Sequence, residues 1–214
     1  MMNVNLISKI TDYVLLNACS LHSSGLYTGK AGVSLALFEV SGLMKDDYLE
    51  ERAFELFEES LLYKGDDLSF HKGYSGIRFA LLYLVEHRFV DADIKELFGK
   101  QEQQLQAFTG ELLPVASISD TPLSVCIDRL YLLRCDEEHN REEIEWLESF
   151  LFSASEDELE RKLLAIMGSK GVNISYSDGL SRWLLYAVYV ESLKCGLDTS
   201  RFSRLFNPLP QWKR

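Results

Sequence analysis

LSFHKGYSGIRFALLYLV, residues 68–85, is the stretch that decides the fold expected for this chain of 214 residues. Two glycines stand three residues apart near its start, and an almost wholly apolar run follows them. The same arrangement occurs in GLYTGKAGVSLALF, residues 25–38, and a less complete copy occurs in YSDGLSRWLLYAV, residues 176–188. A run that is apolar on nearly all sides is typical of a buried helix, so the sequence predicts three buried helices with similar starts.

The glycines at these helix starts are interpreted as structural. Without a Cβ atom, a glycine lets the loop turn tightly and lets the helix approach its neighbour closely. The set consists of Gly25, Gly29, Gly32, Gly73, Gly76 and Gly179.

Amphipathic helices are expected between the buried ones. The clearest covers residues 46–63, where apolar residues form one stripe, glutamates cover the other faces, and Asp46 or Asp47 caps the first turn. In chain order, helices are expected over residues 3–21, 30–43, 46–63, 74–87, 122–135, 140–152, 156–167 and 179–194, with another that starts near residue 91. Residues 196–214 are expected to form an irregular C-terminal tail.

The spacing of the copies predicts repeated α/α hairpins within a single domain over residues 1–214. The positions of Gly29, Gly73 and Gly179 fit about four hairpins of roughly 45–55 residues, a period found in helical repeat proteins. No hairpin can bury its apolar helix alone, so neighbouring hairpins must stack. The fold class is therefore expected to be all-α, with apolar helices in an inner layer and amphipathic helices in an outer layer.

Composition argues against several classes of function. A net charge of −11 disfavours binding to a nucleic-acid backbone or to an anionic membrane. The four cysteines show no metal-type spacing. No signal peptide opens the chain, and no apolar run reaches about 18 residues, so we expect a soluble, cytoplasmic protein.

Residues 25–37 and 71–76 resemble the glycine-rich helix starts of lanthionine synthetase C-like proteins. The resemblance implies an α/α toroid with an inner ring of helices inside an outer ring. Enzymes of that family add cysteine thiols of a precursor peptide to dehydrated Ser or Thr, using zinc held at the inner-helix starts. The implied partners are a precursor peptide or a peptide-modifying enzyme.

The chain is shorter than a complete toroid of this family, which has seven hairpins. About four hairpins would form a partial toroid and would leave flanks of the inner helices without neighbours. Because exposed apolar patches of that kind usually mark an interface, we expect either a homo-oligomer formed through these flanks or a dedicated partner protein that covers them.

The residues before the helix-start glycines depart from the family pattern. The family's zinc ligands are two cysteines and a histidine, with a Cys-His pair just before one such glycine. Here His71 and Lys72 precede Gly73, and a lysine ammonium has no lone pair for a metal. Residues 27–28 and 177–178, at the other two starts, include no cysteine. Because catalytic zinc needs three protein ligands, we expect no zinc, no other cofactor and no catalytic residue.

Seven residues near the helix starts are candidates for binding a ligand: Tyr27, Thr28, His71, Lys72, Arg78, Asp178 and Arg182. His71 either binds a metal or acts as an acid or base, or it bonds a backbone carbonyl. Lys72 and Asp178 either pair or hold a peptide at a shared opening, or they are solvated charges, with Asp178 capping the following helix.

Arg78 and Arg182 interrupt apolar helices. Each either pairs with a carboxylate, such as that of Glu39 or Glu86, or binds the carboxylate of a substrate. The aromatic residues at core spacing are interpreted as packing; they are Phe38, Phe79, Tyr83, Trp183 and Tyr186.

Two functions stay open on these observations. The first is a non-catalytic relative of a lanthionine cyclase, a pseudoenzyme that binds a peptide or serves as an accessory subunit in modified-peptide biosynthesis. The second is an enzyme, thioether cyclase-like or otherwise peptide-modifying, whose active site is completed by a partner chain or by an unusual metal site centred on His71.

Overall fold

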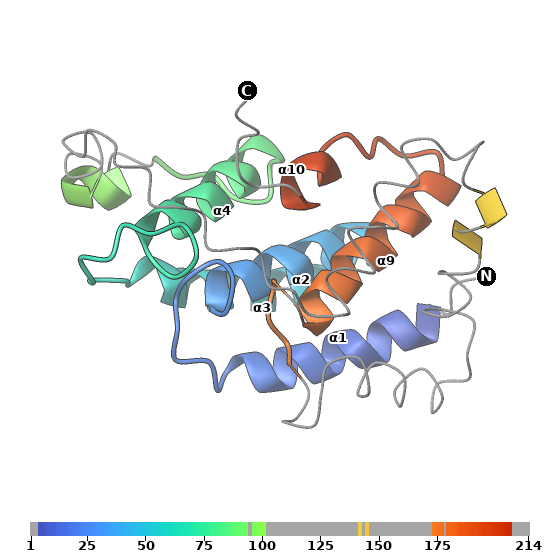
Figure 1. The fold of residues 1–214 in the computed structure, drawn as a ribbon, viewed down its shortest axis with the longest axis horizontal. Helices are drawn as coiled ribbons and strands as arrows, with labels where there is room; N and C mark the ends of the chain where they lie inside the picture. Colours follow the sequence, from blue (N-terminus) through green and yellow to red (C-terminus); the bar gives the residue numbers. More distant parts are fainter. Residues whose placement is uncertain are drawn as a thin grey trace.

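The described part of the chain is all-helical. A computed structural model describes residues 4–93, 96–101, 141–142, 144–145, 173–177 and 179–206. These ranges contain helices and connecting loops and no β-strand, as the sequence predicts. Figure 1 shows the helices packed side by side in a layered arrangement.

The helices begin and end close to the expected residues. They are α1 (Val4–Ala18), α2 (Lys30–Met44), α3 (Asp47–Leu61), α4 (Tyr74–Glu86), α9 (Leu180–Lys194) and α10 (Phe202–Phe206). The predictions for α1, α2, α3, α4 and α9 are confirmed, with small differences at their ends. The helices expected over residues 122–135 and 156–167 lie outside the described residues, as does most of 140–152.

The ends of α2 and α3 follow from local chemistry. Asp46 has an extended backbone, and its carboxylate accepts a hydrogen bond from the backbone N–H of Leu49 at 3.0 Å. The predicted cap of α3 is therefore confirmed, and it satisfies one of the amides left free at a helix start. Lys45, between α2 and α3, takes the left-handed conformation with φ of 54°, which ends α2.

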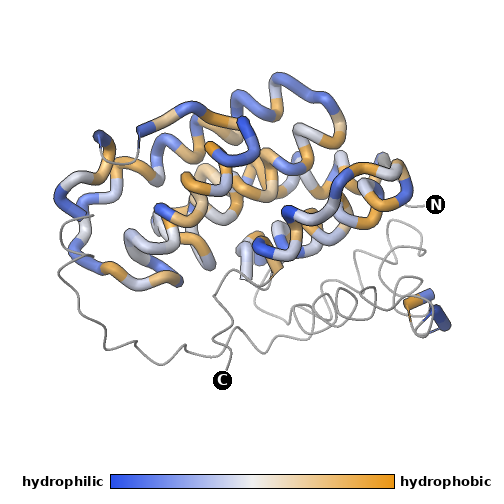
Figure 2. The backbone as a smooth tube through the Cα atoms, turned by 90° about the horizontal axis from the view of Figure 1, so that it is seen from above, coloured by the Kyte–Doolittle hydropathy of each residue, from blue (hydrophilic) through white to orange (hydrophobic). Residues whose placement is uncertain are grey.

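Helix α2 is the centre of the packing. It contacts α3, α9, α4 and α1, and α1 also contacts α9. Every residue of α2 from Ala31 to Ser41 is buried, and α9 is buried along most of its length, whereas α3 buries one stripe. Figure 2 shows hydrophobic residues concentrated toward the middle of the described helices. Hydrophilic residues gather toward the outside and in the connecting loops.

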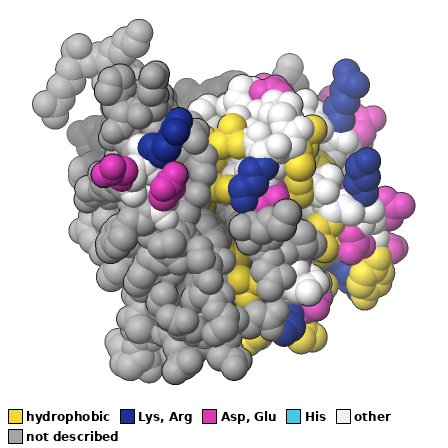
Figure 3. Space-filling view, turned by 90° about the vertical axis from the view of Figure 1, so that its right-hand side faces the viewer, with side chains coloured by type: hydrophobic (Ala, Val, Ile, Leu, Met, Phe, Trp, Pro, Cys, Tyr) yellow, Lys and Arg dark blue, Asp and Glu magenta, His cyan; other side chains and the backbone are white. Residues whose placement is uncertain are grey.

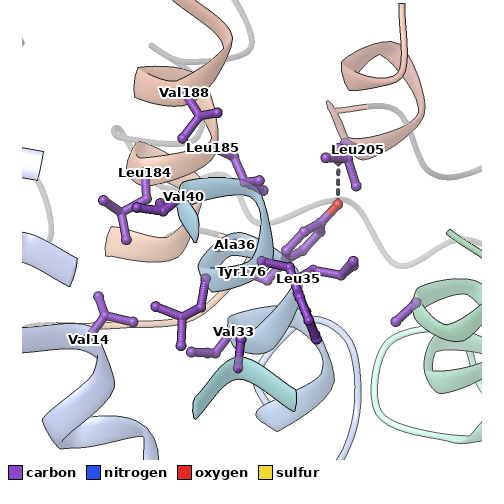
Figure 4. Close-up of a cluster of buried hydrophobic side chains, with 14 of the residues drawn as sticks. Val14, Val33, Leu35, Ala36, Val40, Tyr176, Leu184, Leu185, Val188 and Leu205 are labelled. Atoms are coloured by element: carbon purple, nitrogen blue, oxygen red, sulfur yellow. Dashed lines mark hydrogen bonds between the residues drawn. The ribbon is translucent and has the colours of Figure 1, made fainter. Parts of the chain in front are cut away.

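Aliphatic side chains from three helices interlock at the centre of this core. Figure 4 shows Val40 of α2 close to Leu184 of α9, with Val14 of α1 and Val188 of α9 drawn as members of the same buried cluster. All four are fully buried. Burying one such side chain contributes about 1.5–3 kcal/mol relative to leaving it in water, so this cluster is a main source of stability.

The expectation of an irregular C-terminal tail is wrong for part of residues 196–214. Residues Phe202–Phe206 form α10, and its three apolar side chains are buried. Phe202, Leu205 and Phe206 lie three and four residues apart, which places them on one face of a helix. Prolines farther along the chain suggested an irregular segment, but this apolar face packs against the core.

Large apolar side chains are exposed mainly on the outer helices and connectors. Within the described ranges, none of them belongs to α2, α4 or α9; the exposed ones are Tyr13, Leu16, Tyr48, Phe54, Leu62, Leu97 and Leu197. The flanks of α2 and α9, on which we expected an interface, are buried. Whether the chain self-associates stays a prediction.

The surface mixes both signs of charge. Figure 3 shows basic, acidic and apolar side chains interspersed over the described part of one face. Charged pairs include Lys30 with Glu59 and Lys194 with Glu191. Among the helices that the structure describes, none has the length and apolar character needed to span a bilayer.

Candidate functional site: a cluster of three loops

Three loops of the same construction precede α2, α4 and α9. They are loop 1 (residues 23–29), loop 2 (residues 67–73) and loop 3 (residues 173–179, of which 178 lies outside the described residues). Each opens on a side chain whose oxygen accepts from the backbone N–H two residues later. The acceptors are Ser23, Asp67 and Asn173, at 3.4, 2.7 and 2.8 Å. This local bond starts each loop with the same turn.

The end of each loop also repeats one hydrogen bond. The first helical N–H donates to the carbonyl oxygen of the residue that opens the loop, seven positions earlier. The donors are Lys30, Tyr74 and Leu180, at 2.9, 2.9 and 2.8 Å. Because each loop satisfies the first amide of its own helix, this amide is not available to an anion.

The loops are joined to one another through Tyr27. Its N–H donates to the carbonyl oxygen of His71 in loop 2 at 2.9 Å. Its carbonyl oxygen accepts from the N–H groups of Tyr176 and Ser177 in loop 3, at 3.1 and 3.3 Å. Loop 1 therefore lies between loops 2 and 3, and we call this assembly the loop cluster.

Glycines allow this close approach. A Cβ atom on Gly25 would overlap the backbone of Lys72 in loop 2. A Cβ atom on Gly32 would overlap the carbonyl oxygen of Leu26 and crowd the Cβ of Tyr176 in loop 3. At these two positions the absence of a side chain is needed for the loops to meet.

The candidate residues Tyr27 and His71 lie in direct contact. Their rings stack with centroids 4.4 Å apart and planes 24° apart. Tyr27 is buried and also meets Phe70 edge-on at 6.0 Å and Tyr176 at 6.2 Å, whereas His71 is half-buried. The imidazole therefore lies against an aromatic surface at the centre of the loop cluster, and the carbonyl of the same residue joins two loops.

Lys72 and Thr28 occupy equivalent positions in loops 2 and 1, and both are exposed. Lys72 follows His71, and its backbone lies against Gly25 of loop 1, whereas Thr28 follows Tyr27. Asp178, at the equivalent position of loop 3, lies outside the described residues. The pairing expected between Lys72 and Asp178 therefore stays a prediction.

The two carboxylates named as possible partners of Arg78 and Arg182 bind other arginines. Glu39 binds Arg201, and Glu86 binds Arg204. The guanidinium of Arg182 is buried and donates to the carbonyl oxygens of Leu205 and Phe206, each at 3.0 Å. These carbonyls end α10, where a helix leaves its acceptors unsatisfied, and a cation is favourable there. Arg78 is half-buried on α4.

A second polar cluster, around Glu39, was missed at the level of sequence. Glu39 is 0% exposed; Tyr83 donates its hydroxyl to Oε1 at 2.5 Å, and Arg201 donates to Oε2 at 2.9 and 3.1 Å. Burial and the adjacent carboxylate raise the pKa of Tyr83, so it stays a neutral donor. The signal was present, because Glu39 is the one acidic residue in the apolar sequence of α2.

His87 lies beside this cluster. Its ring centroid is 4.3 Å from that of Tyr83, and its Nε2 is buried without a hydrogen-bond partner among the described residues. Burial lowers the pKa of His87, an effect that the carboxylates of Glu39 and Glu86 partly oppose. The neutral imidazole is therefore favoured.

Neither cluster gathers the side chains of a metal site within the described residues. Over the described ranges, no three residues of the types His, Cys, Asp and Glu gather in a way that could hold a metal ion. Comparisons with protein-family models, with curated proteins and with solved structures found no match. The function proposed below therefore rests on the residues and contacts of this chain.

Proposed function

We propose that this chain is a peptide-binding accessory protein, resembling part of a lanthionine synthetase C-like toroid, that holds a peptide at the loop cluster. One observation carries the proposal. Three loops that are far apart in the sequence share one construction, and backbone hydrogen bonds of Tyr27 join them to one another.

The arrangement of the helices supports a toroid. Loops 1, 2 and 3 are joined at the starts of α2, α4 and α9, and Glu39 meets Tyr83 farther along α2 and α4. Figure 1 shows the three helices running in the same direction. The third copy of the motif lies beside the first, which is the neighbour relation expected where a ring of repeats returns to its beginning.

The loop cluster offers a mixed surface for a peptide. Lys72 supplies an exposed cation, Thr28 an exposed hydroxyl, and His71 a half-buried ring. An exposed ion pair contributes only about 0.2–1 kcal/mol, so recognition requires several of these contacts together. A peptide with an acidic or C-terminal carboxylate beside Ser, Thr or Cys side chains would satisfy the surface.

The test is binding of a fluorescein-labelled synthetic peptide rich in Ser, Thr and Cys, measured by anisotropy. Lys72→Glu is expected to weaken binding by about three- to tenfold, because it replaces attraction with repulsion. Lys64→Glu is the matched control, since Lys64 is also exposed and lies in the same connection between α3 and α4. Equal binding by the two variants would remove the loop cluster from the proposal.

The second candidate function, an enzyme with a metal at His71, is supported by the fixed, half-buried imidazole in the loop cluster. Metal analysis of the purified protein separates the two. Stoichiometric zinc that is lost in His71→Ala would favour the enzyme and overturn the accessory function. Peptide binding that is unchanged by removing metal with a chelator would favour the accessory function.

A further inference from the structure

Helix α10 docks on a surface made by three other helices and loop 3. Figure 1 shows it close to the end of α4 and to α9. Phe202 lies against Tyr189 of α9 with ring centroids 5.7 Å apart, and Phe206 meets Tyr189 at 5.9 Å and Tyr186 at 6.2 Å. The residues that receive α10 are defined here as the α10 docking surface; they are Glu39, Tyr83, Glu86, Tyr176, Arg182, Tyr186 and Tyr189.

Side chains of this surface recognise the backbone of α10. The hydroxyl of Tyr176 donates to the carbonyl oxygen of Leu205 at 2.5 Å, as Figure 4 shows. Arg182 donates to the carbonyl oxygens of Leu205 and Phe206, and its guanidinium carbon lies 5.0 Å from the ring centroid of Phe206. Contacts to backbone carbonyls are independent of side-chain identity, and they are the kind that a protein makes to a bound peptide.

Charge complementarity fixes the register of the docked segment. Arg201 reaches the buried carboxylate of Glu39 through two hydrogen bonds, at 2.9 and 3.1 Å. Arg204, three residues later, pairs with Glu86 on α4. A buried carboxylate is costly unless it is paired, so the surface selects a segment that carries an arginine at this position.

The connection between α9 and α10 is exposed. Residues 194–198 are exposed, and Gly196 within them has φ of 67°. A helix of five residues is not stable alone in water, so α10 takes its helical form from the surface beneath it. Residues 199–206 therefore behave as a short peptide that folds where it binds, held near its site by an exposed linker.

We infer that the α10 docking surface is a peptide-binding site, and that residues 199–206 are an internal strap that occupies it. The ligand is a peptide with the pattern Arg-Phe-x-x-Leu-Phe, whose arginine binds Glu39 and whose apolar residues cover Tyr186 and Tyr189. The strap competes with this ligand at a local concentration on the order of millimolar, as expected for a short flexible linker. The inference shares with the proposed function only the class of ligand, a peptide, and it uses different residues.

Native-state hydrogen exchange on the unaltered full chain is the first test. The amides of Phe202–Phe206 are expected to exchange through local opening, at least about tenfold faster than the most protected amides of α9. If the two helices exchange at the same rate, by global unfolding only, α10 is a permanent part of the core and the inference is overturned.

Competition is the second test. The probe is a labelled synthetic peptide with the sequence of residues 198–206, DTSRFSRLF, titrated against the full chain. Phe202→Ala in the protein weakens the strap and leaves the surface unchanged, so affinity for the peptide is expected to rise at least about tenfold. Leu197→Ala, at an exposed linker residue, is the matched control and is expected to leave affinity unchanged.

Two variants keep the test decisive. Should Phe202→Ala fail to fold by circular dichroism, Arg204→Ala loosens the strap through a half-exposed side chain instead, and a smaller rise in affinity, of up to about fivefold, is then expected. A probe carrying Arg201→Gln is expected to bind at least about tenfold more weakly than the natural sequence, because Glu39 loses its partner. Failure of the folded variants to bind the probe at about millimolar concentration, the local concentration of the strap, overturns the inference.

The tests of the strap can succeed or fail separately from the test of the loop cluster. Binding of DTSRFSRLF together with no effect of Lys72→Glu on the Ser, Thr and Cys-rich peptide would support the strap and reject the loop cluster. The opposite pattern would support the loop cluster and reject the strap.

Discussion

In the loop cluster, backbone atoms join three segments directly, whereas on the α10 docking surface side chains from α2, α4 and α9 hold one segment. Tyr27 links loops 2 and 3 through its own N–H and carbonyl groups. Arg201, by contrast, reaches Glu39 through its guanidinium, and Arg182 reaches two carbonyls in the same way. The first assembly depends on close approach of backbones, and the second depends on charge and hydrogen-bond partners.

This difference determines how each region responds to substitution. The loop cluster tolerates little added volume. A Cβ atom at Gly25 or Gly32 would meet backbone atoms, which cannot move independently of the chain. The α10 docking surface is sensitive to loss of charge, because a buried carboxylate would be left with fewer partners. The four predictions below test the contrast, from the largest expected effect to the smallest.

Gly32→Ala is expected to lower the free energy of unfolding by about 3 kcal/mol, because the new Cβ would overlap the carbonyl oxygen of Leu26. Gly42→Ala is the matched control in the same helix. A Cβ there makes an ordinary contact with Phe89 at 3.4 Å, so the better helix propensity of alanine should make this change neutral or stabilising. Urea unfolding measures both. Equal effects would contradict the role of close approach at Gly32.

Arg201→Ala is expected to lower the free energy of unfolding by about 2 kcal/mol, because two charge-assisted hydrogen bonds to buried Glu39 are lost. Arg204→Ala, whose ion pair with Glu86 is half-exposed, should lower it by less than about 1 kcal/mol. A double-mutant cycle with Glu39→Gln isolates the Arg201 interaction. A coupling energy near zero would show that the Arg201–Glu39 pair does not hold α10 in place.

Asn173→Ala is expected to lower the free energy of unfolding by about 1 kcal/mol, since it removes the 2.8 Å hydrogen bond to the N–H of Ser175 that opens loop 3. Ser23→Ala should have a smaller effect, because the equivalent bond in loop 1 is 3.4 Å long. Thermal unfolding followed by circular dichroism compares the two. A larger effect at Ser23 would mean that these side chains do not set the loops in equivalent ways.

Acidification is expected to destabilise the fold slightly through His87. Burial lowers the pKa of His87 in the folded state below its unfolded value near 6.5, so the unfolded state binds more protons in that range. The contribution of His87 to stability is therefore fully present above pH about 6.5, and it declines as the pH falls from there to the pKa of His87 in the folded state. His87→Gln should flatten this part of the curve of unfolding free energy against pH. A curve unchanged by the substitution would place the dependence on another group.

Local sequence patterns were sufficient to predict the helices and part of the loop cluster. The boundaries of α2, α4 and α9 follow from apolar runs that begin after a glycine, and Asp46 caps α3 where its position predicts. These features depend on residues a few positions apart, whose relative placement is set by helix geometry. The glycines likewise indicated a close approach, although not the backbone that they would meet.

The partners of charged residues required the folded chain. Glu39 was recognisable as a charge in an apolar helix, yet Arg201, its partner, is 162 residues away in sequence. Nothing in local spacing distinguishes Arg201 from Arg78 or Arg182, because electrostatic attraction depends on distance in space. The docking of α10 on Tyr186 and Tyr189, and the placement of loop 3 beside loop 1, were likewise set by packing among segments that the sequence keeps apart.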